Sequence, residues 1–127
     1  MIRRNVLRVA GLLLPRALAV PAAAQSDAMR FSIAIKDGAV ARAHRTLRID
    51  QDAQVRILWT ADTAMTVHLE GYDISIVLRP EQPAEMSFKA YATGRFPVHA
   101  HPGDAGARQG GHAHGRGALL RVEVHPK

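Results

Sequence analysis

Apolar and polar side chains alternate with a period of two along most of the chain. In the first such run, residues 31–35, the apolar residues Phe31, Ile33 and Ile35 share one face. This alternation is typical of strands that bury one face, and it differs from the i, i+3, i+4 apolar spacing of a long helix. The apolar positions of the later runs are Leu47 and Ile49; Val55, Ile57 and Trp59; Met65, Val67 and Leu69; Ile74, Ile76 and Leu78; Met86 and Phe88; Phe96 and Val98; and Leu120, Val122 and Val124. We therefore predict an all-β fold, an antiparallel β-sandwich of seven to eight strands.

The first residues of the chain have a different character from the rest. A basic start with the adjacent Arg3 and Arg4, a short apolar run and a small-residue end are the three parts of a secretory signal. We predict that residues 1–24 are a signal peptide cleaved on export by the twin-arginine or the general secretory route, and that residues 25–127 form a single domain. The apolar run is much shorter than the roughly 20 residues that a membrane-spanning helix needs. The expected location is periplasmic, with no membrane span in the mature chain.

Charge and cysteine content narrow the function classes. Four of the 17 Lys and Arg side chains lie in residues 1–24, so residues 25–127 carry 13 basic and 11 acidic side chains and a net charge of +2. Residues 25–127 contain no basic run with interleaved aromatic residues, which argues against a nucleic-acid partner. The chain contains no cysteine, so neither a disulfide nor a thiolate metal ligand is expected.

Histidines are the candidate metal ligands. His99, His101, His112 and His114 fall close together near the C-terminus, and His68 lies on an earlier predicted strand. Clustered imidazoles are typical of metal sites, and a fold that pairs the two regions would bring His68 beside the cluster.

Other interpretations of these residues stay open. A lone strand histidine is commonly a hydrogen-bonded structural residue, and the glycine-rich and histidine-rich residues 102–117 could form a polar loop without a ligand role. His99 alternates with the predicted core residue Val98, so its side chain is expected to face solvent. Glu70 flanks His68 and could orient an imidazole, bind the ion through oxygen or be a solvated turn charge. The histidines expected to be ordinary surface side chains are His44 and His125.

The order of these features resembles the cupredoxin fold. The matching segments are VHLEGYDI at 67–74, TGRFPVHAH at 93–101 and the closing GALLRVEVHP at 117–126. They represent a strand with one histidine, a strand that leads into a ligand loop, and a last strand. The resemblance covers about residues 30–126 and implies a Greek-key arrangement of the β-sandwich.

The resemblance also implies roles for individual residues. His68 matches the early histidine ligand of that family, and His112 or His114 matches its loop histidine. The family's cysteine position falls at Ala100, or one residue later at His101. The chain lacks both that cysteine and the axial methionine of the family, which excludes its usual electron-transfer site.

The remaining candidates form an all-nitrogen metal site of His68, His101 and one of His112 or His114. Such a site suits Cu(II) or Zn(II), and the resemblance favours a copper ion, with zinc as the other metal considered. We expect a metal-binding, non-enzymatic protein for copper storage, delivery or tolerance, with the metal ion as its partner. Two alternatives are a metal-free cupredoxin-derived module for structure or protein interaction, and a small copper enzyme with a histidine-only site.

Overall fold

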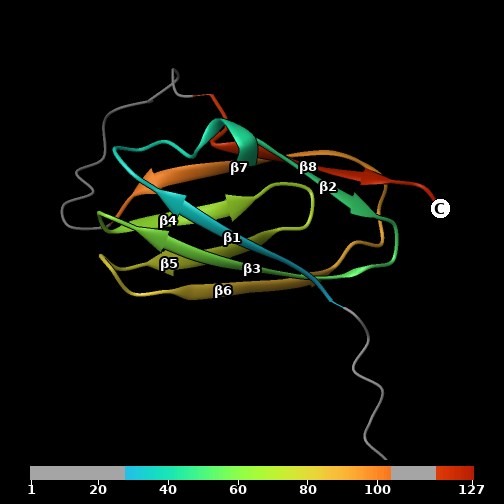
Figure 1. Cartoon of the computed structure of the whole chain (residues 1–127), viewed down its shortest axis with the longest axis horizontal. Helices are drawn as coiled ribbons and strands as arrows, with labels where there is room; N and C mark the ends of the chain where they lie inside the picture. The colour runs from blue at the N-terminus through green and yellow to red at the C-terminus, as the bar shows by residue number, and fades with distance from the viewer. Residues whose placement is uncertain (1–27, 104–116) are drawn as a thin grey trace, which may run out of the picture.

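Two packed β-sheets make up the computed structural model of the chain, which describes residues 28–103 and 117–127 (Figure 1). One sheet has the strand order β1-β3-β6 and the other has the order β2-β8-β7-β4-β5. The elements are β1 (Met29–Ile35), the 3₁₀ helix η1 (Arg42–His44), β2 (Thr46–Asp50), β3 (Gln54–Ala61), β4 (Met65–Leu69), β5 (Ile74–Leu78), β6 (Ala84–Lys89), β7 (Gly94–Pro102) and β8 (Leu120–His125). The prediction of an all-β sandwich with up to eight strands is confirmed.

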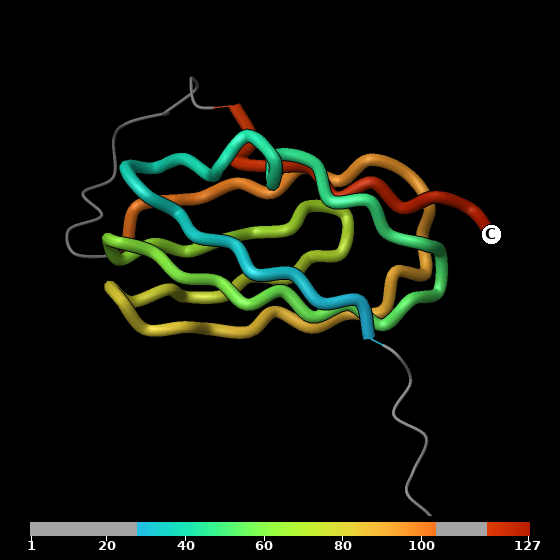
Figure 2. Tube along the Cα trace, viewed as in Figure 1, coloured from blue at the N-terminus to red at the C-terminus, as the bar shows by residue number. Residues whose placement is uncertain are grey.

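The sheets are mixed, whereas the sequence predicted antiparallel pairing throughout. β1 runs parallel to β3 and β2 runs parallel to β8, while the β3–β6, β4–β5, β4–β7 and β7–β8 pairs are antiparallel. The cause is the path of the chain, which leaves β1, crosses to β2 in the other sheet and returns to β3 (Figure 2). An edge strand with one buried face has the same alternating pattern in either direction, so the pattern could not distinguish the two pairings.

The core lies between the two sheets and consists of the inward-facing residues of every strand. Trp59, Ile57 and Val67 are completely buried there, and each such side chain contributes about 1.5–3 kcal/mol through burial. Within residues 28–103 and 117–127, no polar or charged side chain is fully buried. The polar members of each strand therefore lie on the two outer faces, where they are available for binding.

Part of the sequence prediction falls outside the described residues. The predicted signal peptide, residues 1–24, is among these, as are residues 104–116. In the part of the chain that the structure describes, no helix is long and apolar enough to cross a membrane.

The tight turn between β4 and β5 in the larger sheet is hydrogen-bonded to the segment that connects β6 to β7. Tyr72 in the turn donates a hydrogen bond to the carbonyl oxygen of Ala92 at 2.8 Å and accepts one from the Ala92 N–H at 3.1 Å. Its ring lies edge-on to Phe96, with the centroids 4.9 Å apart. Burial raises the pKa of the Tyr72 hydroxyl, which keeps it a neutral donor. The preceding residue, Gly71, has a φ of 84° and lies against the Phe96 ring.

We expect Gly71→Ala to destabilise the protein by roughly 2–4 kcal/mol, because the new methyl group would collide with the Phe96 ring at a positive φ. Gly117→Ala is the control, since open space surrounds Gly117, and its effect should stay within about 0.5 kcal/mol. Urea denaturation of both variants measures the difference. Equal stabilities would show that this turn tolerates a side chain at Gly71.

Candidate metal centre

Three histidines project from the outer face of the larger sheet, on the neighbouring strands β4 and β7. His68 on β4 is directly opposite His99 on β7, and Thr66 is directly opposite His101. Because side chains alternate along a strand, these three histidines lie on the face opposite the buried Val98. Side chains directly opposite each other have Cβ atoms about 4.5–5.5 Å apart, and diagonal neighbours are about 7–8 Å apart. His68 and His99 are therefore the closest pair, and His101 lies one step farther along β7.

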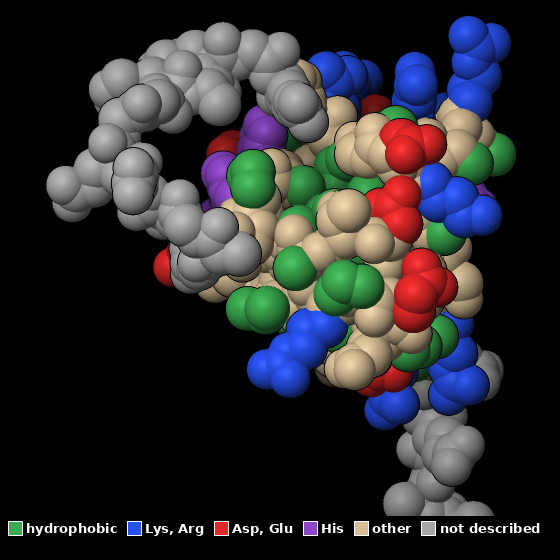
Figure 3. All heavy atoms as spheres, turned by 90° about the vertical axis from the view of Figure 1, so that its left-hand side faces the viewer, with side chains coloured by type: hydrophobic (Ala, Val, Ile, Leu, Met, Phe, Trp, Pro, Cys, Tyr) green, Lys and Arg blue, Asp and Glu red, His purple; other side chains and the backbone are tan. Residues whose placement is uncertain are grey.

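All three imidazoles can be reached from solvent. The side chains of His68 and His99 are half-buried, and that of His101 is exposed. In the view onto the end of the molecule where β7 finishes, His side chains (purple) lie together at the left-hand edge (Figure 3). An ion from solution thus has access to these imidazoles.

A serine on the edge strand contacts His68. Ser75 on β5 is the register partner of His68, and its Oγ forms a 2.7 Å hydrogen bond with His68 Nδ1. Three strands therefore contribute one row of outer-face side chains, Ser75, His68 and His99.

Glu70 contacts His99, although the sequence placed it beside His68 as a candidate partner. Its carboxylate Oε1 lies 3.4 Å from His99 Nε2. The backbone N–H of Glu70 donates a 3.0 Å hydrogen bond to the carbonyl oxygen of Pro97 on β7. This hydrogen bond extends the contact between β4 and β7 beyond the end of β4. Glu70 therefore lies opposite Pro97, and its carboxylate can reach His99 diagonally across the two strands.

Among residues 28–103 and 117–127, no group of three or more His, Cys, Asp or Glu side chains is arranged to hold a metal ion. His68 and His99 are adjacent, and His101 occupies the same face. His112 and His114 lie outside the described residues, so their place in the ligand set stays a prediction.

The inner face of β7 does not fit a copper–thiolate centre. Ala100 packs against the core and His101 is exposed, so of the two candidate cysteine positions Ala100 is the one that faces inward. A methyl group has no metal-binding atom, and the chain has no cysteine elsewhere to replace it. The side chains of β7 that carry metal-binding atoms are the imidazoles of its outer face, His99 and His101.

His99 is the residue that the predicted ligand set omitted. Strand alternation did place His99 on the solvent side, and the same alternation places His68 and His101 there. What the sequence could not supply is the register between β4 and β7, which sets His99 directly opposite His68.

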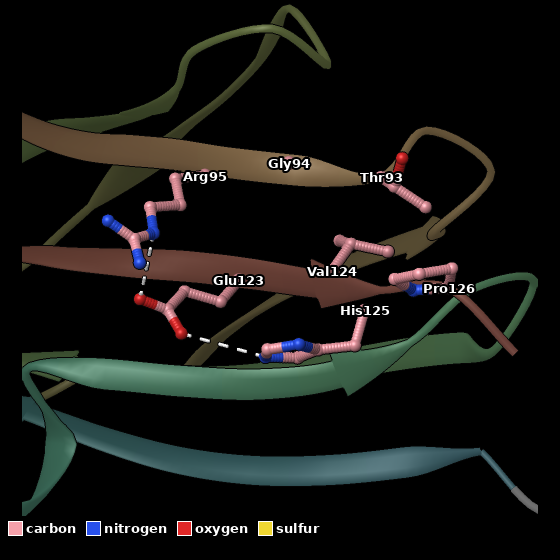
Figure 4. Close-up of a pocket in the computed structure, with 7 residues that line it drawn as sticks. All are labelled: Thr93, Gly94, Arg95, Glu123, Val124, His125 and Pro126. Carbon is pink, nitrogen blue, oxygen red and sulfur yellow. Dashed lines mark ion pairs between the residues drawn. The ribbon is translucent and has the colours of Figure 1, made fainter.

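The other two histidines are elsewhere in the fold. His44 is half-buried in η1, and His125 is exposed at the end of β8, as predicted for a surface residue. Arg95 and His125 both approach Glu123, at 3.4 and 3.6 Å, beside an open depression of about 340 Å³ (Figure 4). Gly94, at the start of β7, pairs with Val124, so His125 lies at the opposite end of β7 from His101.

Neither a known protein family nor a curated protein matches this sequence. Solved structures do match its fold. A blue copper oxidase from Nitrosomonas europaea has a TM-score of 0.57 at 17% identity, over 80% of this chain and 40% of that one. A copper-binding protein solved in its apo form has a TM-score of 0.53 at 7% identity, over 79% of this chain and 99% of the other. A copper-containing nitrite reductase from Thermus scotoductus has a TM-score of 0.54 at 20% identity, over 79% of this chain and 28% of that one.

At these identities the likeness concerns the fold. The chain spans less than half the length of the oxidase and of the nitrite reductase. All three are cupredoxin-fold proteins, and the likeness extends over both sheets of the sandwich. The chain therefore has the cupredoxin fold.

Proposed function

We propose that this protein binds a copper ion through imidazoles on the outer face of the larger sheet, and that it serves copper storage, delivery or tolerance in the periplasm. The observation that carries the proposal is the register of β4 and β7, which places His68 directly opposite His99 with His101 on the same face. His101, His112 and His114 are the candidates to complete the shell. The predicted export signal supports the periplasmic location.

The donor chemistry supports copper as the metal. For a site of nitrogen donors the affinity of divalent ions rises toward Cu(II) and falls again at Zn(II). The structural neighbours include a copper-binding protein and copper-containing enzymes, which agrees with that choice. We assign the chain a binding role without catalysis, because the imidazoles lie on the outer face of the larger sheet.

A metal-free module for structure or protein interaction is the second candidate. The observation in its favour is Ala100, which occupies the inward position where the fold family has its cysteine ligand. Copper titration separates the two candidates.

We expect the wild-type chain to bind one Cu(II) and to gain about 2.7 kcal/mol of stability when the ion is at a hundredfold excess over its Kd. His68→Ala should abolish most of the binding and most of the gain, because it removes the histidine at the centre of the row. The control is His125→Ala, which changes an exposed histidine at the other end of β7 and should leave both unchanged. Isothermal titration and thermal unfolding at neutral pH measure the two effects. Equal copper-induced stabilisation of wild type and His68→Ala would contradict the proposed site.

The double variant His112→Ala/His114→Ala tests whether the histidines of residues 104–116 complete the shell. We expect it to weaken copper binding in the same titration, whereas the stability of the metal-free protein should be unchanged. Wild-type affinity in the double variant would restrict the ligands to β4 and β7.

The copper-loaded protein should lack the intense blue absorption of a copper–thiolate bond, because the chain has no cysteine. A weak visible band and a tetragonal, nitrogen-rich electron paramagnetic resonance spectrum are the expected signals. An intense blue band in the purified chain would rule out the all-nitrogen site.

A further inference from the structure

We propose that Glu70 is a positioning residue that makes His99 a copper ligand through Nδ1, while Ser75 leaves Nε2 of His68 as the second ligand atom. This inference rests on the proposed function and adds to it the ligand atoms and the side chains that select them. It adds His99 to the ligand set.

The carboxylate of Glu70 selects the tautomer of His99. A neutral imidazole has one protonated and one bare ring nitrogen, and only the bare nitrogen binds a metal. Glu70 Oε1 lies 3.4 Å from His99 Nε2, a charge contact and not a formed hydrogen bond, and a carboxylate beside a ring nitrogen stabilises a proton on that nitrogen. The proton of His99 is therefore favoured on Nε2, which leaves the lone pair of Nδ1 for the ion.

The hydroxyl of Ser75 contacts Nδ1 of His68, the histidine directly opposite His99. Its Oγ contacts His68 Nδ1 at 2.7 Å, so Nδ1 is already engaged and Nε2 is the free nitrogen. A serine hydroxyl can accept from an N–H. With copper at Nε2, His68 keeps its proton on Nδ1 and donates it to Ser75.

Both positioning groups are held by the backbone of the sheet. Ser75 is the register partner of His68 on β5. The backbone of Glu70 is held by the hydrogen bond from its N–H to the Pro97 carbonyl oxygen, and Gly71 follows it in the tight turn against Phe96. These contacts restrain the two imidazole rings in the metal-free protein, and such restraint lowers the cost of ordering a site.

The test is Glu70→Gln, which keeps the size of the side chain and removes its charge. A glutamine amide can donate or accept, so it no longer favours one tautomer of His99. Long-range ¹H–¹⁵N correlation spectra of the metal-free protein at pH 8 should show the Nε2–H form of His99 in wild type and a mixture in the variant. Copper affinity, measured by competition titration, should fall about 10–100-fold in the variant. The denaturation midpoint should not change, because Glu70 is exposed.

The matched control is Glu85→Gln on β6 in the smaller sheet, where Glu85 pairs with Arg56, and it should change neither the tautomer nor the affinity. An Nδ1–H tautomer of His99 in wild type, or unchanged copper affinity in Glu70→Gln, would overturn the role of Glu70. A wild-type chain that binds no copper would overturn the proposed function. In that case the spectra of the metal-free protein would still show, independently of copper, whether Glu70 determines which ring nitrogen of His99 carries the proton.

Discussion

The register between β4 and β7 is the constraint on which the candidate site depends. The core side chains Val67, Leu69 and Val98 face inward in this register, and a slip by one residue would turn those of the shifted strand toward solvent. The same slip would bury His68 or His99 without a partner, at a cost of several kcal/mol. Burial of the core therefore fixes the face on which the histidines lie, although the histidines themselves contribute little to the core.

The two faces of β7 have different chemistry, and this difference decides which donor atoms the strand can offer to a metal ion. On the inner face, Ala100 contributes a methyl group to the core. On the outer face, His99 and His101 lie beside His68, with Glu70 and Ser75 in contact with two of the imidazoles. An ion bound there would be held by nitrogen donors near solvent, an arrangement that suits uptake and release of copper more than electron transfer through a buried thiolate centre.

Much of the fold could be predicted from the sequence, because period-two alternation reports directly which side of a strand is buried. Trp59, Val67 and Val122 lie where that pattern placed them. The parallel pairing of β1 with β3 could not be predicted, since it depends on the crossover of β2 to the other sheet.

For the site, alternation sufficed to put His68 and His101 on an outer face, but not to choose their neighbours. The pairing of His68 with His99, and the reach of Glu70 to His99 in place of His68, follow from strand register and from one backbone hydrogen bond. The local sequence pattern of one strand contains no information on register, because register depends on how two strands pair.

The most direct test of the central claim is the position of the copper itself. Anomalous diffraction at the copper absorption edge, from crystals grown with one equivalent of Cu(II), locates the ion without assumptions about its ligands. The account predicts a peak on the outer face of β4 and β7, about 2 Å from a ring nitrogen of His68 and of His99. A peak elsewhere on the molecule, or none in crystals that contain copper in solution, would contradict it.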